Sequence, residues 1–356
     1  MEVERPWTER DFKFERKVGE GAFGAVYKAR ENTSGDIVAV KKLKVLDNDR
    51  KNFEGIVMEM RILCSIDHKN IVSYKGSFWD SDKRHVFIVM EFLGGGDLSD
   101  KIQKSKTGRS SIPESKIWSY LIQLLKGLKV LHDLKIIHRD IKSANCFLSE
   151  DLNTIKLGDM NVSKVTRNNF ASTQVGTPLY LSPQIWMGKS YDSKTDIWSL
   201  GVLLYEMCTL NYPFMGLNMN QLKSAVTRGR YAPIPSYLNS DFSKLISMML
   251  QMDPMKRPSV DELLNGPIIA NKISHHMDMT ISDLKKLNMK LMDTIKIPQN
   301  FKNVNLPKKK KPAQGLPRSN SAANIRPSSA QSSRGGGDTP ARISARGSRV
   351  ISGSLT

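Results

Sequence analysis

The stretch IHRDIKSANCFLSEDLNTIKLGDMN, residues 137–161, decides how the rest of the chain is interpreted. It holds two carboxylates, Asp140 and Asp159, nineteen positions apart, with Lys142 and Asn145 between them. Two short apolar runs, CFL and TIKL, are separated by SEDLN, which predicts the two strands of a small hairpin. The hairpin would hold these polar groups together at its mouth. Such a set suits metal-assisted transfer of an anionic group, whereas any single acid could equally be a solvated loop residue.

Composition limits the class of protein. The 356 residues, 39% of them hydrophobic, leave room for one large two-lobed domain plus a tail. Cys64, Cys146 and Cys208 lie far apart and form no C-x-x-C pair, so we expect reduced core cysteines of an intracellular protein. The charged N-terminus lacks the apolar segment of a secretory signal, and no apolar run approaches the ~20 residues that span a bilayer. These features predict a soluble cytosolic or nuclear protein.

The net charge of +19 is unevenly distributed along the chain. From Lys308 onward there are ten Lys and Arg against one acid, Asp338, so this part supplies +9 of the total. Nucleic-acid binding is therefore not implied for the folded part. The tail has almost no large apolar residues, which predicts disorder. It could bind an acidic surface such as a microtubule, an anionic membrane or RNA, or merely remain solvated.

A second informative run, GEGAFGAV, lies at residues 19–26 and allows backbone amides to approach phosphate oxygens without a Cβ clash. A dinucleotide-binding turn has the same glycines but opens a helix, whereas AVYKAR alternates like a strand. A turn at 32–36 and a second strand, IVAVKKL, complete a hairpin with a glycine flap. Lys41 shares a face with Ala39, toward the flap, while Lys42 is predicted to face solvent.

These motifs together resemble those of a eukaryotic protein kinase. The matches are G-x-G-x-x-G-x-V at 19–26, V-A-I-K ending at Lys41, H-R-D-x-x-x-x-N at 138–145 and the acid of D-F-G at Asp159. The resemblance implies an α+β, two-lobed kinase fold, in which an antiparallel N-lobe sheet and helix αC precede a mainly helical C-lobe. The predicted parts are an N-terminal extension (1–11), the kinase domain (12–269), a helical or extended post-kinase segment (270–306) and a disordered basic tail (307–356). Within the domain we expect the N-lobe at about 12–90, the hinge at 91–96 and the C-lobe at 97–269.

The resemblance assigns a role to each polar group of the opening stretch. Phosphoryl transfer from ATP to a Ser or Thr hydroxyl requires positioning, Mg²⁺ and charge compensation. By resemblance, Asp140 accepts or orients the proton of the attacking hydroxyl, and Lys142 neutralises the moving phosphate. Asn145 and Asp159 supply the hard oxygen ligands that magnesium prefers.

Further roles fall on the N-terminal part of the chain. A predicted helix at 53–65 carries Glu59, which by resemblance pairs with Lys41 and orients it, unless it is an exposed charge. Met90 would be the gatekeeper before the adenine-binding hinge, and Asp97 a ribose or substrate contact or, equally, a helix N-cap. The nucleotide-binding residues implied by the resemblance are Val18, Gly19, Glu20, Gly21, Ala22, Phe23, Gly24, Ala25, Val26, Lys41, Glu91 and Leu93.

Two departures from the kinase pattern concern assembly of the site. Met160 and Asn161 replace the Phe and Gly of D-F-G. Met160 has an apolar side chain of similar reach to Phe, and Asn161 tolerates the left-handed backbone angles that Gly adopts. The run Ser-Pro-Gln ending at Gln184 replaces A-P-E, whose acid usually pairs with an arginine matched here by Arg257. A glutamine keeps the hydrogen bond and loses the charge, so we expect a weaker latch.

The segment between these departures holds the predicted regulatory residues. By resemblance Thr173 is the activating phosphosite, a target of an upstream kinase or of autophosphorylation. By the same resemblance, Thr177 would bond Asp140 and Lys142 to shape the substrate pocket. Arg139 and Lys164 could form a phosphate clamp around a phosphorylated hydroxyl.

The runs HRDIKSANCFL, KLGD, GTPLYLSP and DIWSLG further resemble the NIMA-related (NEK) serine/threonine kinases. That group implies protein substrates, roles in cell division, microtubules, centrosomes or cilia, and a cytoplasmic, cytoskeletal or nuclear location. We expect no membrane span and no specific nucleic-acid partner. The alternative function is a weakly active kinase-fold scaffold that its basic tail recruits to an acidic polymer.

Overall fold

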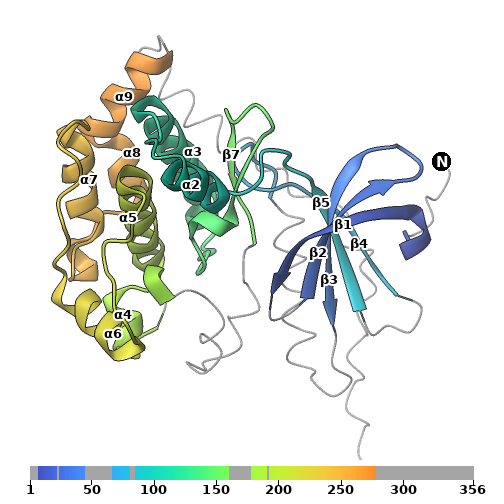
Figure 1. Cartoon of the computed structure of the whole chain (residues 1–356), viewed down its shortest axis with the longest axis horizontal. Helices are drawn as coiled ribbons and strands as arrows, with labels where there is room; N and C mark the ends of the chain where they lie inside the picture. Colours follow the sequence, from blue (N-terminus) through green and yellow to red (C-terminus); the bar gives the residue numbers. More distant parts are fainter. Residues whose placement is uncertain are drawn as a thin grey trace, which may run out of the picture. The chain divides into compact units, whose positions relative to one another are not determined.

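The computed structural model describes residues 7–21, 24–44, 66–80, 85–159, 178–190 and 192–277 (Figure 1). All of them belong to the first of two compact units, which covers residues 1–302. A 3₁₀ helix, η1 (Glu9–Asp11), precedes a five-stranded antiparallel sheet of order β1-β2-β3-β5-β4. The strands are β1 (Phe12–Gly21), β2 (Gly24–Glu31), β3 (Ile37–Lys44), β4 (Tyr74–Trp79) and β5 (His85–Glu91).

The alternation of side chains along β3 gives the sheet two different faces. Val38 and Val40 are fully buried and belong to an apolar cluster with Phe78 and Phe87, whose rings stack at 4.7 Å. Lys41 points to the opposite face, which lines a cavity, as the sequence predicts. Lys42 is half-exposed and places its ammonium 5.0 Å from the centre of the Phe87 ring, so it packs on the sheet as well as facing water.

A mainly helical part follows the sheet. Its helices are α2 (Leu98–Thr107), α3 (Glu114–Asp133), α4 (Pro183–Trp186), α5 (Ser193–Thr209), α6 (Met219–Arg228), α7 (Ser240–Met249), α8 (Val260–Asn265) and α9 (Pro267–Met277), with 3₁₀ turns η2 (Ser143–Asn145), η5 (Pro178–Tyr180) and η6 (Pro254–Lys256). Helix α3 buries an apolar stripe and stacks Trp118 on Phe242 of α7 at 4.1 Å. Helix α5 begins where the Asp192 carboxylate accepts a hydrogen bond from the Thr195 amide at 3.0 Å. These contacts make α3, α5 and α7 the core of the helical part.

A two-stranded hairpin, β6 (Cys146–Leu148) and β7 (Ile155–Leu157), confirms the strands predicted from CFL and TIKL. The Asp151 carboxylate closes its turn by accepting a hydrogen bond from the Asn153 amide at 3.0 Å and another from the Ser149 hydroxyl. These hydrogen bonds lower the pKa of Asp151 to about 2. The hairpin contacts α3, so the residues before β6 and after β7 are held against the helical part.

The other predictions of secondary structure have mixed outcomes. The predicted strands AVYKAR, IVAVKKL and VFIVM lie in β2, β3 and β5, and DIWSLG lies in α5. Helix α9 continues past residue 269, where we expected the domain to end. The predicted helix at 53–65 and the tail at 307–356 lie outside the described residues. Cys146 and Cys208 are buried free thiols, as expected.

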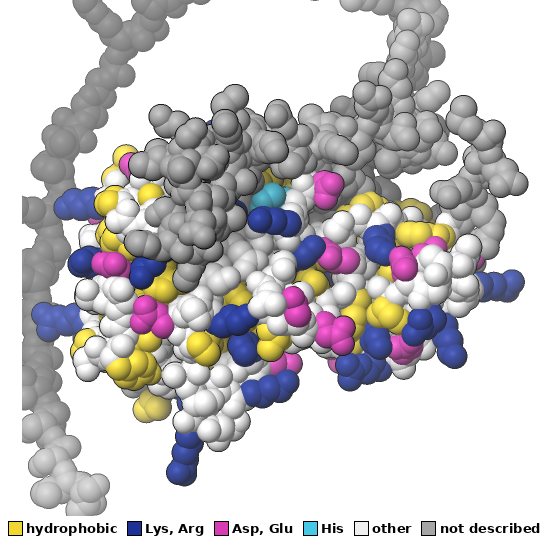
Figure 2. All heavy atoms as spheres, turned by 90° about the horizontal axis from the view of Figure 1, so that it is seen from above, with side chains coloured by type: hydrophobic (Ala, Val, Ile, Leu, Met, Phe, Trp, Pro, Cys, Tyr) yellow, Lys and Arg dark blue, Asp and Glu magenta, His cyan; other side chains and the backbone are white. Residues whose placement is uncertain are grey.

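Charges on the described surface are mixed in sign. On the face in Figure 2, Lys and Arg side chains alternate with Asp and Glu instead of forming one basic patch. This agrees with the sequence, which places much of the excess positive charge after residue 307. Within the described ranges, no helix has the length and apolar character needed to cross a membrane.

Candidate active site

The loop before β6 brings three of the predicted polar groups into direct contact. The Lys142 ammonium lies 3.1 Å from Asp140 Oδ2. The side-chain amide of Asn145 donates to the Asp140 carbonyl at 2.8 Å and to its Oδ2 at 3.0 Å. The Asp140 carboxylate therefore has a fixed position. Among the described residues none donates to Asn145 Oδ1, so this oxygen is available to a ligand.

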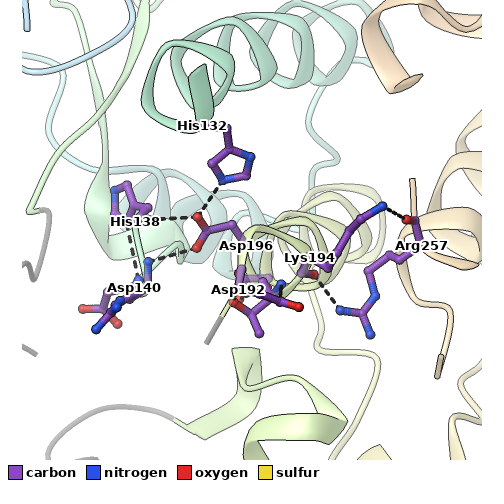
Figure 3. A network of polar contacts seen from close by, with 10 residues as sticks. His132, His138, Asp140, Asp192, Lys194, Asp196 and Arg257 are labelled. Atoms are coloured by element: carbon purple, nitrogen blue, oxygen red, sulfur yellow. Dashed lines mark hydrogen bonds and ion pairs between the residues drawn. The ribbon is translucent and has the colours of Figure 1, made fainter. Parts of the chain in front are cut away.

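A buried acid on α5 fixes the backbone that leads into this loop (Figure 3). Asp196 is 1% exposed and accepts hydrogen bonds from the amides of His138 at 2.8 Å and Arg139 at 2.9 Å. The His132 ring lies 2.9 Å from the same carboxylate. Arg139 has a left-handed φ of 67°, which is uncommon for a residue with a side chain. The bonds to Asp196 hold this unfavourable conformation, so Asp196 anchors the backbone that leads into the loop.

The second predicted carboxylate pairs with the lysine of β3. Asp159 follows β7, and its Oδ1 accepts a hydrogen bond from the Lys41 ammonium. The positive charge of Lys41 is the largest cause of a lowered pKa of Asp159, and Lys142 acts in the same direction. Asp159 is therefore ionised at neutral pH. The sequence predicts Glu59 as the partner of Lys41; Glu59 lies outside the described residues, and the pair with Asp159 was not predicted.

These groups open onto a cavity of about 400 Å³ between the sheet and the helical part. Val26, Ala39 and Met90 form its wall on the sheet, and Phe147 and Leu157 of the hairpin form the opposite wall. Of the predicted nucleotide-binding residues, the cavity is lined by Val18, Val26, Lys41, Glu91 and Leu93. Gly19, Glu20, Gly24 and Ala25 lie in β1 and β2 and are not among the described residues that line the cavity. Gly21 ends β1, and Ala22 and Phe23 lie outside the described residues.

A comparison of the sequence with known proteins identifies this arrangement. The sequence model of the protein kinase domain matches residues 12–269, which is well over half of the chain. The chain belongs to the protein kinase family. The motifs that carry Lys41, Asp140 and Asp159 all lie within the matched residues.

The curated relatives identify the group of kinases. A Dictyostelium discoideum protein described as a probable serine/threonine-protein kinase nek2 is 39% identical over 276 residues, 76% of this chain and 66% of the relative. Human Nek5 is 38% identical over 264 residues, 74% of this chain and 37% of the relative. Mouse Nek4 is 35% identical over 281 residues, 78% of this chain and 35% of the relative. The resemblance to NIMA-related kinases is confirmed, and the chain spans only part of the length of these relatives.

Glu91, at the start of the predicted hinge, makes contacts that the sequence did not reveal. Glu91 Oε1 accepts a hydrogen bond from the Ser73 amide and pairs with the Lys156 ammonium, both at 2.6 Å. Lys156 lies between Ile155 and Leu157, which are buried on the other face of β7. This alternation of side chains along β7 predicts that Lys156 points away from the buried face, but it does not predict that Glu91 is its partner.

Two further kinase residues have identifiable structural roles. The Asp97 carboxylate accepts a hydrogen bond from the Asp100 amide at 2.9 Å, so Asp97 is the N-cap of α2, while its contact with a ribose or substrate stays a prediction. It also lines the cavity, and burial raises its pKa. Gly158 lies between the hairpin and the sheet, where an added Cβ would lie 2.8 Å from the Phe147 ring and 2.9 Å from Val72. Glycine is therefore required at this wall of the cavity.

The glutamine that replaces the usual glutamate keeps its contact with Arg257. The Arg257 guanidinium donates to Gln184 Oε1 at 3.3 Å, longer than its bonds to the carbonyls of Lys194 at 2.6 Å and Gln251 at 2.8 Å. Arg257 is 1% exposed, and burial lowers its pKa to about 10. The predicted latch is present, and its link to Gln184 is the longest of the hydrogen bonds that hold this guanidinium.

Several predicted residues fall outside the described part of the chain. They are Glu59, Met160, Asn161, Lys164, Thr173 and Thr177. Arg139, the other half of the predicted phosphate clamp, is described, and its backbone is held by Asp196. The regulatory roles stay predictions.

Proposed function

We propose that this protein is a serine/threonine protein kinase that transfers the γ-phosphate of ATP to Ser or Thr hydroxyls of other proteins. One observation carries this proposal: the ion pair of Lys41 with Asp159 lines the cavity, and the Asp140, Lys142 and Asn145 cluster is joined to it through the Gly158 amide, which donates to the Asn145 carbonyl at 3.0 Å. The relatives, all named serine/threonine kinases, support the same activity.

The cavity suits the adenine base of ATP. Its walls carry apolar side chains such as Val26, Ala39 and Leu157, which exclude water from a flat ring. The backbone of Glu91 to Leu93 follows at its edge and offers polar groups to the base. Because Glu91 is held by Ser73 and Lys156, this backbone is fixed relative to both β4 and β7.

The residues also fit a magnesium ion. Magnesium prefers a few hard oxygen ligands and completes its shell with water and substrate phosphates. Asn145 Oδ1 and the second oxygen of Asp159, Oδ2, receive no hydrogen bond from any described residue, and Asp159 is ionised. When bound, Mg²⁺ would neutralise charge on the phosphates.

The chain's own groups then orient the acceptor and the phosphate. Asp140, fixed by Lys142 and Asn145, can accept the proton of the attacking hydroxyl. The Lys142 ammonium lies beside that carboxylate and can compensate charge on the group in transfer. Lys41, held by Asp159, is placed to contact the phosphates from the opposite side.

A transfer assay with radiolabelled ATP, Mg²⁺ and dephosphorylated casein tests this function. We expect label on serine or threonine after acid hydrolysis, and Lys41→Met should reduce incorporation by at least ~10²-fold. No incorporation by the wild-type protein above that of Lys41→Met would contradict the proposal and favour the scaffold.

We also propose a setting for this activity, supported by the resemblance to NIMA-related kinases. The protein would act in the cytoplasm or nucleus, at microtubules, centrosomes or cilia, and its basic tail would contact an acidic polymer such as tubulin. Co-sedimentation with microtubules before and after deletion of residues 308–356 tests the tail, and equal pelleting would count against it.

Activation at Thr173 predicts that Thr173→Ala lowers peptide phosphorylation and that wild-type protein carries phosphate at Thr173.

A further inference from the structure

We propose that Ser143 is a positioning residue for phosphoryl transfer, because it joins the turn between Lys142 and Asn145 to the acceptor side of the site. It does so through a buried carboxylate, Glu206, and a buried phenol, Tyr180. This inference rests on the proposed kinase function. No motif of the opening stretch gives Ser143 a role in the chemistry.

Three side chains from distant parts of the chain meet at this point. The Ser143 hydroxyl lies 3.0 Å from the Tyr180 hydroxyl and donates to Glu206 Oε1 at 3.2 Å. The Tyr180 hydroxyl donates to the other oxygen, Glu206 Oε2. The Ser143 amide donates to the Tyr180 oxygen at 3.3 Å. The three residues are 2%, 6% and 3% exposed for Ser143, Tyr180 and Glu206, so no bulk water competes for these bonds.

The hydrogens in this cluster have a consistent arrangement when Glu206 is ionised. A carboxylate accepts hydrogen bonds, and the Ser143 and Tyr180 hydroxyls can each donate their one hydrogen to it. The Tyr180 oxygen is then free to accept the Ser143 amide hydrogen. Each donor is used once, and removing the Ser143 hydroxyl leaves Glu206 Oε1 without this donor. Because a buried carboxylate is costly when poorly satisfied, the cluster resists displacement of any member.

The cluster lies directly beside the catalytic groups. Ser143 begins the turn η2, whose last residue, Asn145, donates its amide to the Lys142 carbonyl at 3.0 Å. Lys142, which precedes Ser143, and Asn145 at the end of the turn both contact Asp140. A shift of Ser143 would therefore move the proposed magnesium ligand Asn145 and the phosphate-compensating Lys142 together.

On the other side, Tyr180 belongs to the acceptor surface. Tyr180 and Leu181 line a small hollow together with Asp140 and Lys142. The Tyr180 backbone is also tied to α5, because the Ser199 hydroxyl donates to its carbonyl at 3.0 Å. Through Ser143, the residues that handle the phosphate and those that face the acceptor hydroxyl share one anchor on α5. A displacement of about 1 Å in such a constellation can cost ~10²-fold in rate.

A kinetic comparison with separate substrates tests this role. With a short Ser/Thr peptide as acceptor, we expect Ser143→Ala to lower kcat by roughly 10-fold or more and to raise the KM of the peptide. The KM of ATP should rise less than the KM of the peptide, because Ser143 does not line the nucleotide cavity and acts on it only through Asn145 and Lys142. Ser143→Thr keeps a hydroxyl and should restore most of kcat.

The pH profile supplies a readout that a purely structural role would not move. Burial raises the pKa of Glu206, and the hydrogen bonds from Tyr180 and Ser143 oppose that rise. Beyond Tyr180, the titratable groups around Glu206 are Tyr212, which hydrogen-bonds it, Lys106 of α2 and the Cys146 thiol. Ser143→Ala removes one of the hydrogen bonds that lower the pKa of Glu206, so Glu206 should protonate at a higher pH. The decline of kcat on the acid side of its pH profile, the acid limb, should then begin at a higher pH than in wild type.

A matched control separates this effect from the loss of any nearby hydroxyl. Ser199→Ala removes a hydroxyl that contacts the Tyr180 carbonyl and not Glu206, so its acid limb should coincide with that of wild type. Absence of transfer by the wild type would instead refute the proposed function. An active wild type whose kcat, peptide KM and acid limb are unchanged in Ser143→Ala would overturn the role of Ser143. Equal loss in Ser143→Ala and Ser143→Thr, parallel to a fall in Tm, would also overturn it.

Discussion

Replacement of Gln184 by glutamate should stabilise the domain, because the structure leaves a buried cation with a neutral partner. Arg257 is 1% exposed and contacts Gln184 Oε1 at 3.3 Å, while the Gln184 side-chain nitrogen is buried without a hydrogen-bond partner among the described residues. Of the described acids, none forms an ion pair with Arg257 within 4.0 Å. Gln184→Glu would supply a charge of the right sign at the right place.

The expected size follows from the bonds that change. A hydrogen bond between charged groups contributes ~1.5–3 kcal/mol against ~1 for a neutral one, and an unpaired buried donor costs ~1–3 kcal/mol. Desolvation of the new carboxylate offsets part of this gain, less than usual because the Arg257 charge is already buried. We therefore expect a net gain of about 1–2 kcal/mol. For a domain of this size that raises Tm by roughly 2–8 °C.

Differential scanning calorimetry of wild type and Gln184→Glu measures this shift. Two further variants serve as controls. Gln184→Met removes the acceptor and should lower Tm. Gln103→Glu makes the same chemical change at an exposed position within α2 and should leave Tm nearly unchanged. A lower Tm for Gln184→Glu than for wild type would refute the reasoning, since it would mean that a charged partner for Arg257 at this position does not stabilise the domain.

Two other variants probe the frame of the site. The Asp196 carboxylate accepts hydrogen bonds from the amides of His138 and Arg139, and Asp196→Asn replaces one of its two acceptor oxygens with a donor. We expect the free energy of unfolding, measured by urea denaturation, to fall by about 2–4 kcal/mol. An unchanged urea midpoint would contradict the role of Asp196 as an anchor of this backbone. Gly158→Ala places a methyl group 2.8 Å from the Phe147 ring and should lower the free energy of unfolding by about 1–3 kcal/mol. It should also raise the KM of ATP several-fold in steady-state kinetics. An unaltered KM would show that the cavity wall adapts to the methyl group.

The parts of the molecule that could be predicted from sequence are those set by local pattern. The hairpin strands β6 and β7 follow from short apolar runs bounded by turn residues, and β3 follows from alternation. Asp140, Lys142 and Asn145 lie within six residues, so their proximity depends on one turn, η2, and not on the rest of the fold. The face of Lys41 followed from the period of a strand.

The parts that could not be predicted are side-chain pairs made across the fold. Lys41 meets Asp159 across 118 positions, and Glu91 meets Lys156 across 65, and neither spacing leaves a trace in local periodicity. Glu206 did leave a signal, since it is an acid inside the apolar run VLLYEM of α5. A charge at a buried helical position requires partners, but only the fold shows that they are Ser143 and Tyr180.

Transfer of phosphate at Asp140 is tested most directly by removing that carboxylate and nothing else. Asp140→Asn keeps the size of the side chain and one oxygen that can accept a hydrogen bond from Lys142, and removes the charge. Asp151→Asn makes the same change on an exposed turn of the adjacent hairpin. In the assay with radiolabelled ATP and casein, we predict that Asp140→Asn loses at least ~10²-fold in kcat and that Asp151→Asn retains the wild-type rate. Equal rates for wild type and Asp140→Asn would contradict the assignment of this site.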